Sequence, residues 1–207
     1  MELSAIEQRV LGALIEKEMA TPDYYPLSLN ALVNACNQKN NREPVLSLTE
    51  SDVLGAIEVM RHSGLAFEIS GPQHRVAKYS HGLGAKLNLG NRELAILSVL
   101  LCRGPQTPGE LRGRTQSLYA FEDLESVLLT LERMAKREEL PLVKELPRAP
   151  GSRENRWSHL LGAPGSGAEV QEEVAMPAKA DRMADLERRV AELESFVERL
   201  KGQLGIG

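Results

Sequence analysis

Apolar residues recur at helical spacing through the first part of the chain and predict three helices. The first helix is indicated by apolar residues that recur at helical spacing, namely Leu3, Ile6, Val10, Leu11 and Leu14. A capping box formed by Ser4 and Glu7 predicts its start, and Thr21-Pro22 predicts its end. A short second helix is expected from about Ser28. A third should follow Thr49 as N-cap, with an inner face made by Val53, Leu54, Ile57 and Met60.

Two strands are expected after the third helix. Gly64 is placed to end that helix in the left-handed conformation. Residues 65–69 and 75–79 have strand character, and the turn residues between them are typical of a hairpin. The first half of the chain is therefore predicted to run helix, helix, helix, strand, strand.

The same order returns in the second half. Asn91 is expected to cap a helix, and Thr107 with Glu110 forms a capping box that has Pro108 at the first helical position. A third helix over about 121–137 should bury Leu124, Val127, Leu128, Leu131 and Met134. Strands are expected over 142–146 and 155–158, on either side of a Gly/Pro loop.

The two halves are copies of one unit. Val10-Leu11-Gly12-Ala13-Leu14 is answered by Ile96-Leu97-Ser98-Val99-Leu100, and Tyr79-Ser80-His81 by Trp157-Ser158-His159. The element order is that of a winged helix. We therefore predict a mainly α protein with small β-hairpins (α+β), built from two tandem winged-helix domains over residues 1–83 and 86–161. Units of ~75 residues are small and individually marginal, so the two should pack on each other or on another chain.

A different pattern follows the second copy. Residues 162–180 are rich in Gly, Pro and Ala and predict a flexible linker. Residues 181–205 are expected to form a C-terminal helix with a heptad repeat of apolar residues, Met183, Leu186, Val190, Leu193, Val197, Leu200 and Leu204. The spacing favours a parallel coiled coil and hence a homodimer. The alternative is a helix that folds back on its own chain.

Charge is distributed unevenly. Residues 1–80 carry 7 Lys and Arg against 10 Asp and Glu, whereas residues 86–160 carry 12 against 10, within a total net charge of −4. A dedicated DNA-binding domain is usually plainly basic. The small excess of positive charge in the second half is therefore weak support for DNA binding. Only Cys36 and Cys102 are cysteines, without metal-site spacing, which favours a reduced cytoplasm. The chain start lacks a signal-peptide pattern, and no apolar run reaches the ~20 residues that span a bilayer, so we expect no membrane contact.

Basic residues gather away from the third helices, which are acidic. In the first half they are Lys39, Arg42, Arg75 and Lys78, and in the second half Arg103, Arg112, Arg114, Arg148, Arg153 and Arg156. Because Lys and Arg supply DNA affinity by neutralising phosphates, these residues form the candidate nucleic-acid interface, strongest in the second domain. The alternative is an ordinary solvated rim that pairs with nearby glutamates.

No residue pattern points to catalysis, a metal or a cofactor. His81 and His159 occupy matched positions and favour packing or strand-end hydrogen bonds over a metal role. No phosphate-binding Gly-rich loop or paired-acid constellation occurs, so we do not expect an enzyme. The amide-rich loop at 37–42 could read adenine edges, but Asn and Gln there more readily serve turns.

Two long runs resemble a known family. TPDYYPLSLNALVNACNQK at residues 21–39 and RGPQTPGELR at residues 103–112 resemble the YceH family of uncharacterised bacterial proteins with two winged-helix domains. The similarity covers roughly residues 1–162 and departs from the family near residues 79–83. It implies a fold and a bacterial cytoplasm but no activity. Two hypotheses follow: a DNA-binding regulator-like protein, or a protein-interaction scaffold without nucleic-acid contact.

Overall fold

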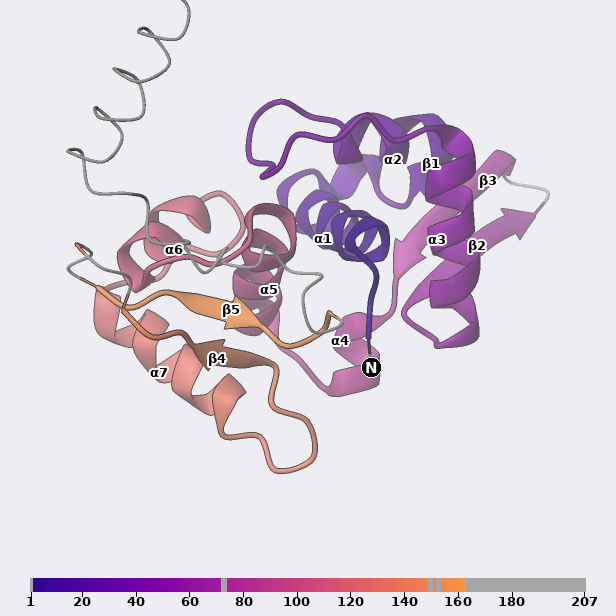
Figure 1. Cartoon of the computed structure of the whole chain (residues 1–207). Coiled ribbons are helices and arrows are strands. Elements are labelled where there is room, and N and C mark those ends of the chain that lie inside the picture. The colour runs from indigo at the N-terminus through magenta and orange to yellow at the C-terminus, as the bar shows by residue number, and fades with distance from the viewer. Residues whose placement is uncertain (1, 72–73, 149–150, 152–153, 163–207) are drawn as a thin grey trace, which may run out of the picture. The chain divides into compact units, whose positions relative to one another are not determined.

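A computed structural model describes residues 2–71, 74–148, 151 and 154–162 of the chain (Figure 1). These residues form a mixed α+β structure with seven α-helices and two small antiparallel sheets. The first half comprises α1 (Ala5–Ala20), the 3-10 helix η1 (Pro22–Tyr24), β1 (Leu27–Ser28), α2 (Leu29–Cys36), α3 (Glu50–His62), β2 (Ala66–Gly71) and β3 (His74–His81). Then come α4 (Leu83–Leu87), α5 (Asn91–Arg103), α6 (Pro108–Arg114), α7 (Leu124–Ala135), β4 (Val143–Glu145) and β5 (Trp157–His159).

The predicted C-terminal segments fall outside the described residues. This applies to residues 163–180 of the expected linker and to the whole heptad helix, 181–205. Among the described helices, none combines the length and the apolar character needed to cross a bilayer.

Local capping signals set most of the helix starts. The backbone N–H of Glu7 donates to Ser4 Oγ at 3.3 Å and so begins α1, as predicted. Thr49 caps α3 and Thr107 caps α6 in the same way. Asn91 was expected to cap α5, and this is wrong. The cap is Gly90, whose N–H donates to the Glu93 carboxylate at 3.1 Å, so that Asn91 is the first helical residue.

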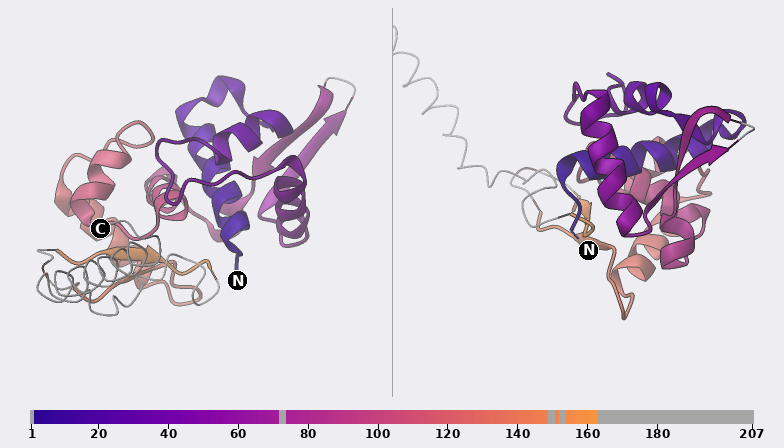
Figure 2. Two further views of the ribbon diagram at one scale, coloured as in Figure 1. Left: turned by 45° about the horizontal axis from the view of Figure 1, so that its top comes forward. Right: turned by 90° about the vertical axis from the view of Figure 1, so that its right-hand side faces the viewer.

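The hairpins lie close to the predicted strands. The first sheet has the order β1-β3-β2, with Phe67 opposite Ser80 and Leu27 opposite Tyr79. Gly64 has φ +68°, the left-handed geometry that was expected after α3. In both views of Figure 2 the β2–β3 hairpin projects from the helices of the first half. The second sheet, β4 with β5, is shorter than predicted.

Three short elements were not predicted, and the first of them is η1, which follows α1. Strand β1 is only two residues long, and α4 follows β3 directly and connects the halves. The second half has its own counterpart of β1, because Gln106 pairs with Trp157 in an isolated bridge just before α6. In each half, therefore, the residues that precede the second helix pair with the last strand.

Two predicted core residues are exposed. The buried stripe of α3 follows Val53, Ile57 and Met60, and Leu54 lies off that stripe with 40% of its surface exposed. Leu124 is the first residue of α7 and precedes its buried stripe, so it is 39% exposed. The apolar periodicity located both buried stripes, but it included one exposed residue in each.

The centre of the molecule is the contact between α1 and α5. Residues 8–15 of α1 are buried without interruption, and so are residues 94–102 of α5. A helix that is buried on every side lies inside a core rather than at its edge. Figure 1 shows α1 and α5 in the middle, with the rest of each half outside them. The two halves therefore share one continuous core and belong to one compact unit.

Gly12 permits the close approach of these helices. A Cβ atom at this position would lie 2.7 Å from Cys102 Sγ and 2.9 Å from Leu101 Cβ, closer than real atoms approach. Ser98 Oγ of α5 donates a hydrogen bond to the Gly12 carbonyl at 3.2 Å. Glycine inside a helix is less stable than alanine, but at this position it lets α1 and α5 pack closely.

We expect Gly12→Ala to lower the free energy of unfolding by about 1–3 kcal/mol, because the added methyl forces α1 and α5 apart. The matched control is Gly55→Ala in α3, where an added Cβ meets nothing within 4 Å. This control should gain about 0.5–1 kcal/mol from helix propensity alone. Urea unfolding measures both. If Gly12→Ala proved as stabilising as the control, the close helix contact would be wrong.

Candidate nucleic-acid interface

The structure separates the predicted basic residues into several environments. Lys39, Arg112 and Arg148 are exposed. A second group is half-buried and consists of Lys78, Arg103, Arg114 and Arg156. Arg75 lies in β3, but its side chain is outside the described part of the chain, as is the whole of Arg153.

Three of these arginines come together around α6. Arg156, just before β5, contacts the Glu110 carboxylate at 2.8 Å and donates to the Pro105 carbonyl at 2.9 Å. Arg114 lies 3.7 Å from the same carboxylate. Burial and the nearby positive charge of Arg103 lower the pKa of Arg114, although Glu110 opposes this shift. Positive charge is therefore concentrated here beyond what one carboxylate neutralises.

Glu110 keeps its charge in this setting. Burial alone would raise the pKa of its carboxyl. A hydrogen bond from the Thr107 backbone and attraction from Arg156 and Arg114 outweigh burial and lower it. One glutamate therefore serves both as the capping-box residue of α6 and as the counterion of two arginines.

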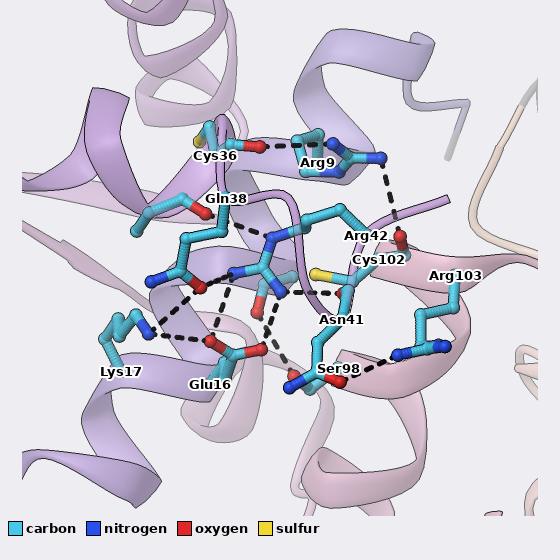
Figure 3. A network of polar contacts seen from close by, with 12 residues as sticks. Arg9, Glu16, Lys17, Cys36, Gln38, Asn41, Arg42, Ser98, Cys102 and Arg103 are labelled. Carbon is cyan, nitrogen blue, oxygen red and sulfur yellow. Dashed lines mark hydrogen bonds and ion pairs between the residues drawn. The ribbon is translucent and has the colours of Figure 1, made fainter. Parts of the chain in front are cut away.

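Arg42 does not belong to an exposed interface. Its side chain has no exposed surface, so its predicted role as a phosphate contact on the surface is wrong. The guanidinium binds the Glu16 carboxylate of α1 through two nitrogens at 2.7 and 3.0 Å (Figure 3). Its Nε donates to the Ala35 carbonyl near the end of α2. We call residues 37–44, which carry Arg42, the junction loop.

Arg9 was missed as a functional or structural residue by sequence reasoning. It is 3% exposed and donates to the carbonyls of Cys36 at 3.1 Å and Pro44 at 2.6 Å. A longer contact of 3.4 Å reaches the carbonyl of Cys102. Cys36 ends α2 and Cys102 lies in the last turn of α5, so one cation meets the negative ends of two helices. The only sequence signal was a charged residue inside an apolar helix.

The two cysteines are buried beside these arginines and are free thiols. Burial raises the pKa of Cys36 to about 12 and that of Cys102 to about 11. Both thiols therefore stay protonated at neutral pH and are poor nucleophiles.

The matched histidines have different surroundings. His81 Nε2 lies 2.6 Å from the Glu18 carboxylate, and its backbone N–H donates to Tyr25 Oη at 2.7 Å. His159 is buried, and burial lowers its pKa to about 4, so its ring is neutral at pH 7. Within the described residues no three His, Cys, Asp or Glu side chains gather in a way that could hold a metal ion.

Comparison with known proteins places the chain in a family. Residues 3–152 match the family model described as "Protein of unknown function, DUF480". The chain belongs to this family. A UPF0502 protein of Solibacter usitatus is 52% identical over 200 residues, which cover 97% of this chain and 93% of that protein. A UPF0502 protein of Burkholderia multivorans is 44% identical over 218 residues, covering 99% and 90% of the two chains.

Family membership carries no activity with it. A further member from Opitutus terrae is 46% identical over 191 residues, covering 92% of this chain and 83% of that protein, under the same description. The printed names of these relatives state no ligand, substrate or partner.

The buried ion pair at the junction gives a stability prediction. Burial alone would raise the pKa of the Glu16 carboxyl, but Arg42 and then Lys17 lower it below the ordinary 4.5. Glu16→Gln should cost about 3–5 kcal/mol at pH 7, because it leaves the Arg42 charge buried without a counterion. The double variant Glu16→Gln/Arg42→Met should cost less than the two single changes together. Chemical denaturation measures each value.

The direction in which the cost of Glu16→Gln changes with pH follows from the lowered pKa of Glu16. A carboxyl with a lowered folded pKa stabilises the fold above its unfolded pKa, and this contribution disappears as pH falls through the folded value. The cost of Glu16→Gln should therefore shrink below about pH 4.5. The control is Glu58→Gln, from an exposed pair with Arg61, which should cost less than about 1 kcal/mol. Equal losses for Glu16 and Glu58 would contradict the buried pair.

Proposed function

We propose that this protein is a non-enzymatic, DNA-binding, regulator-like protein of the bacterial cytoplasm, built from two tandem winged-helix domains. The observation that carries the proposal is the arginine-rich surface around α6 and the second hairpin. Arg112 and Arg148 are exposed, and each is followed along the chain by a half-buried arginine, Arg114 and Arg156 respectively. Helix, helix, helix, strand, strand occurs in both halves and supports the winged-helix reading.

The third helices are poor candidates for groove contact. In α3, Arg61 is held by Glu58 at 3.1 Å and by Glu68 of β2 at 3.0 Å, so its charge is already neutralised. Lys136, which caps the C-terminal end of α7, pairs with Glu132 of that helix at 2.9 Å. Acidic side chains in these helices would repel phosphates. The proposed DNA contact therefore runs through α6 and the β4–β5 hairpin rather than through α3 or α7.

Fluorescence polarisation with random duplex DNA across a salt series tests this. We expect binding at low salt that weakens steeply as salt rises, because bound counterions are released. Arg112→Ala/Arg148→Ala should weaken binding and reduce the slope of log K against log salt by about 2, near 0.9 per lost phosphate contact. Both side chains are exposed, and the hydrogen bond from Arg112 to the Glu122 carbonyl at 2.8 Å lies at the surface, so its loss should leave the fold intact.

The matched control removes two exposed cations at the C-terminal end of α7, Arg133→Ala/Lys136→Ala. It should leave the salt slope unchanged. A loss of slope in the control instead would move the contact to the third helix, and absence of binding at low salt would exclude DNA binding altogether.

Dimerisation through the heptad helix is the second part of the proposal, and it rests on the sequence pattern alone. Light scattering of the full chain should give twice the chain mass of 22.8 kDa. Leu193→Asp at a core heptad position should give a monomer, whereas Ser195→Asp on the outer face of the same helix should not. A full chain that is monomeric at micromolar concentration would exclude the parallel dimer.

The alternative function is a protein-interaction scaffold. The observation that favours it is the apolar surface of the first half, where Phe67 and Val76 of the hairpin and Val59 of α3 are each at least half exposed. Exposed apolar groups in such number are typical of protein contacts. The DNA titration separates the two functions, since a scaffold would show no salt-dependent binding of duplex.

A further inference from the structure

A cavity of about 170 Å³ lies where the two halves meet. We call it the junction pocket. Its walls come from the end of α1, the junction loop, the end of α5 and the segment after α6. At ~30 Å³ per water molecule the space holds five or six water-sized groups, which is the size of a small ion or metabolite.

The polar lining of the junction pocket is dominated by cations. Lys17, Arg103 and Arg114 reach it from three different elements. Glu16 is the only carboxylate in the lining described, and Arg42 binds it through two nitrogens from behind. Lys17 also contacts Glu16, at 2.9 Å. The lining itself therefore holds three cations against one carboxylate and carries an excess of positive charge.

Arg103 is the residue that most needs a partner. One of its terminal nitrogens donates to Asn41 Oδ1 at 2.7 Å, which is a neutral amide oxygen (Figure 3). Its Nε is buried and has no hydrogen-bond partner, and no carboxylate pairs with its guanidinium within the described ranges. A buried donor left unsatisfied costs free energy that a bound oxyanion would recover.

The helix ends at the junction pocket do not oppose an anion. The C-terminal end of α5 is there, and its free carbonyls would repel negative charge. The carbonyl of Cys102 is already satisfied, because it accepts from the Glu43 backbone N–H at 2.8 Å and faces Arg9. This carbonyl at the end of α5 is therefore already paired with donors of the protein.

We propose that the junction pocket binds a small anion carrying a phosphate group, with Arg103 and Arg114 as its main ligands. A guanidinium fork donates two parallel hydrogen bonds to a phosphate, and two such forks from different elements fix its position. Lys17 adds a third charge, and Gln38, Asn41 and Ser117 provide neutral hydrogen-bonding groups around the rim. The bound anion connects α1 and the junction loop of the first half with α5 and α6 of the second. The site does not depend on DNA binding.

Isothermal titration calorimetry of the full chain with inorganic phosphate, in a buffer whose only anion is chloride, tests the site. Arg103→Gln and Arg114→Gln should each weaken binding at least about tenfold, since each removes charge-assisted hydrogen bonds to the anion. The matched control is Arg133→Gln, which removes the same charge from an exposed position in α7 and is not part of the lining. It should bind phosphate as the wild type does.

Two further arms secure the result. Ser117→Leu narrows the pocket without changing charge and should also weaken binding, which general surface attraction would not produce. Circular dichroism and thermal unfolding show that each variant is folded. Succinate in place of phosphate distinguishes a dicarboxylate ligand. The proposal is overturned by no phosphate binding at millimolar concentration, by equal loss in Arg133→Gln, or by tighter binding of succinate. Since duplex DNA is absent, failure here is separate from failure of the DNA titration.

Discussion

The fold depends on two arginine side chains that are buried in the middle of the protein. Arg9 and Arg42 occupy the place where α2, α5 and the junction loop meet, and they satisfy backbone carbonyls that these elements cannot satisfy among themselves. Burying a charge is costly unless it is paired and hydrogen-bonded, and both conditions hold for Arg42 with Glu16. Removing either arginine would leave helix ends without donors in the middle of the protein.

This arrangement also determines where the remaining positive charge can act. Arg42 takes up the carboxylate of Glu16, and Glu110 takes up part of the charge of Arg114 and Arg156. What is left over lies on Arg103 inward, toward the junction pocket, and on Arg112 and Arg148 outward. The basic residues of the second half therefore contribute to two different sites, the enclosed junction pocket and the open surface around α6.

Much of the local structure could be predicted from the sequence. The starts of three helices could be predicted from their N-cap residues, Ser4, Thr49 and Thr107. A capping box acts over three residues and needs no distant partner. Apolar periodicity located the core of each helix for the same reason. It failed at Leu54 and Leu124, where the neighbouring element, and not the helix itself, decides the edge of the buried face.

The candidate site was harder to predict, because it is made of long-range contacts. Arg42 was placed on the surface since arginine is usually exposed, and only the fold brings Glu16 to it across 26 positions. Arg9 gave no usable signal, as its partners are backbone carbonyls that every sequence has. Arg103 and Arg114 line the pocket whereas Arg112 and Arg148 are exposed, and sequence spacing could not separate these two pairs.

The hydrogen bond between Ser98 and Gly12 has a meaning beyond packing. Aligning the two copies puts Gly12 of the first opposite Ser98 of the second, so the bond joins equivalent positions. In a symmetric homodimer, residues that touch their own counterparts lie on the two-fold axis. The α1–α5 contact therefore has the layout of an isologous dimer interface enclosed within one polypeptide. Covalent linkage frees such an interface from concentration dependence, and it allows the two sides to diverge, one keeping a small residue and the other gaining a hydroxyl.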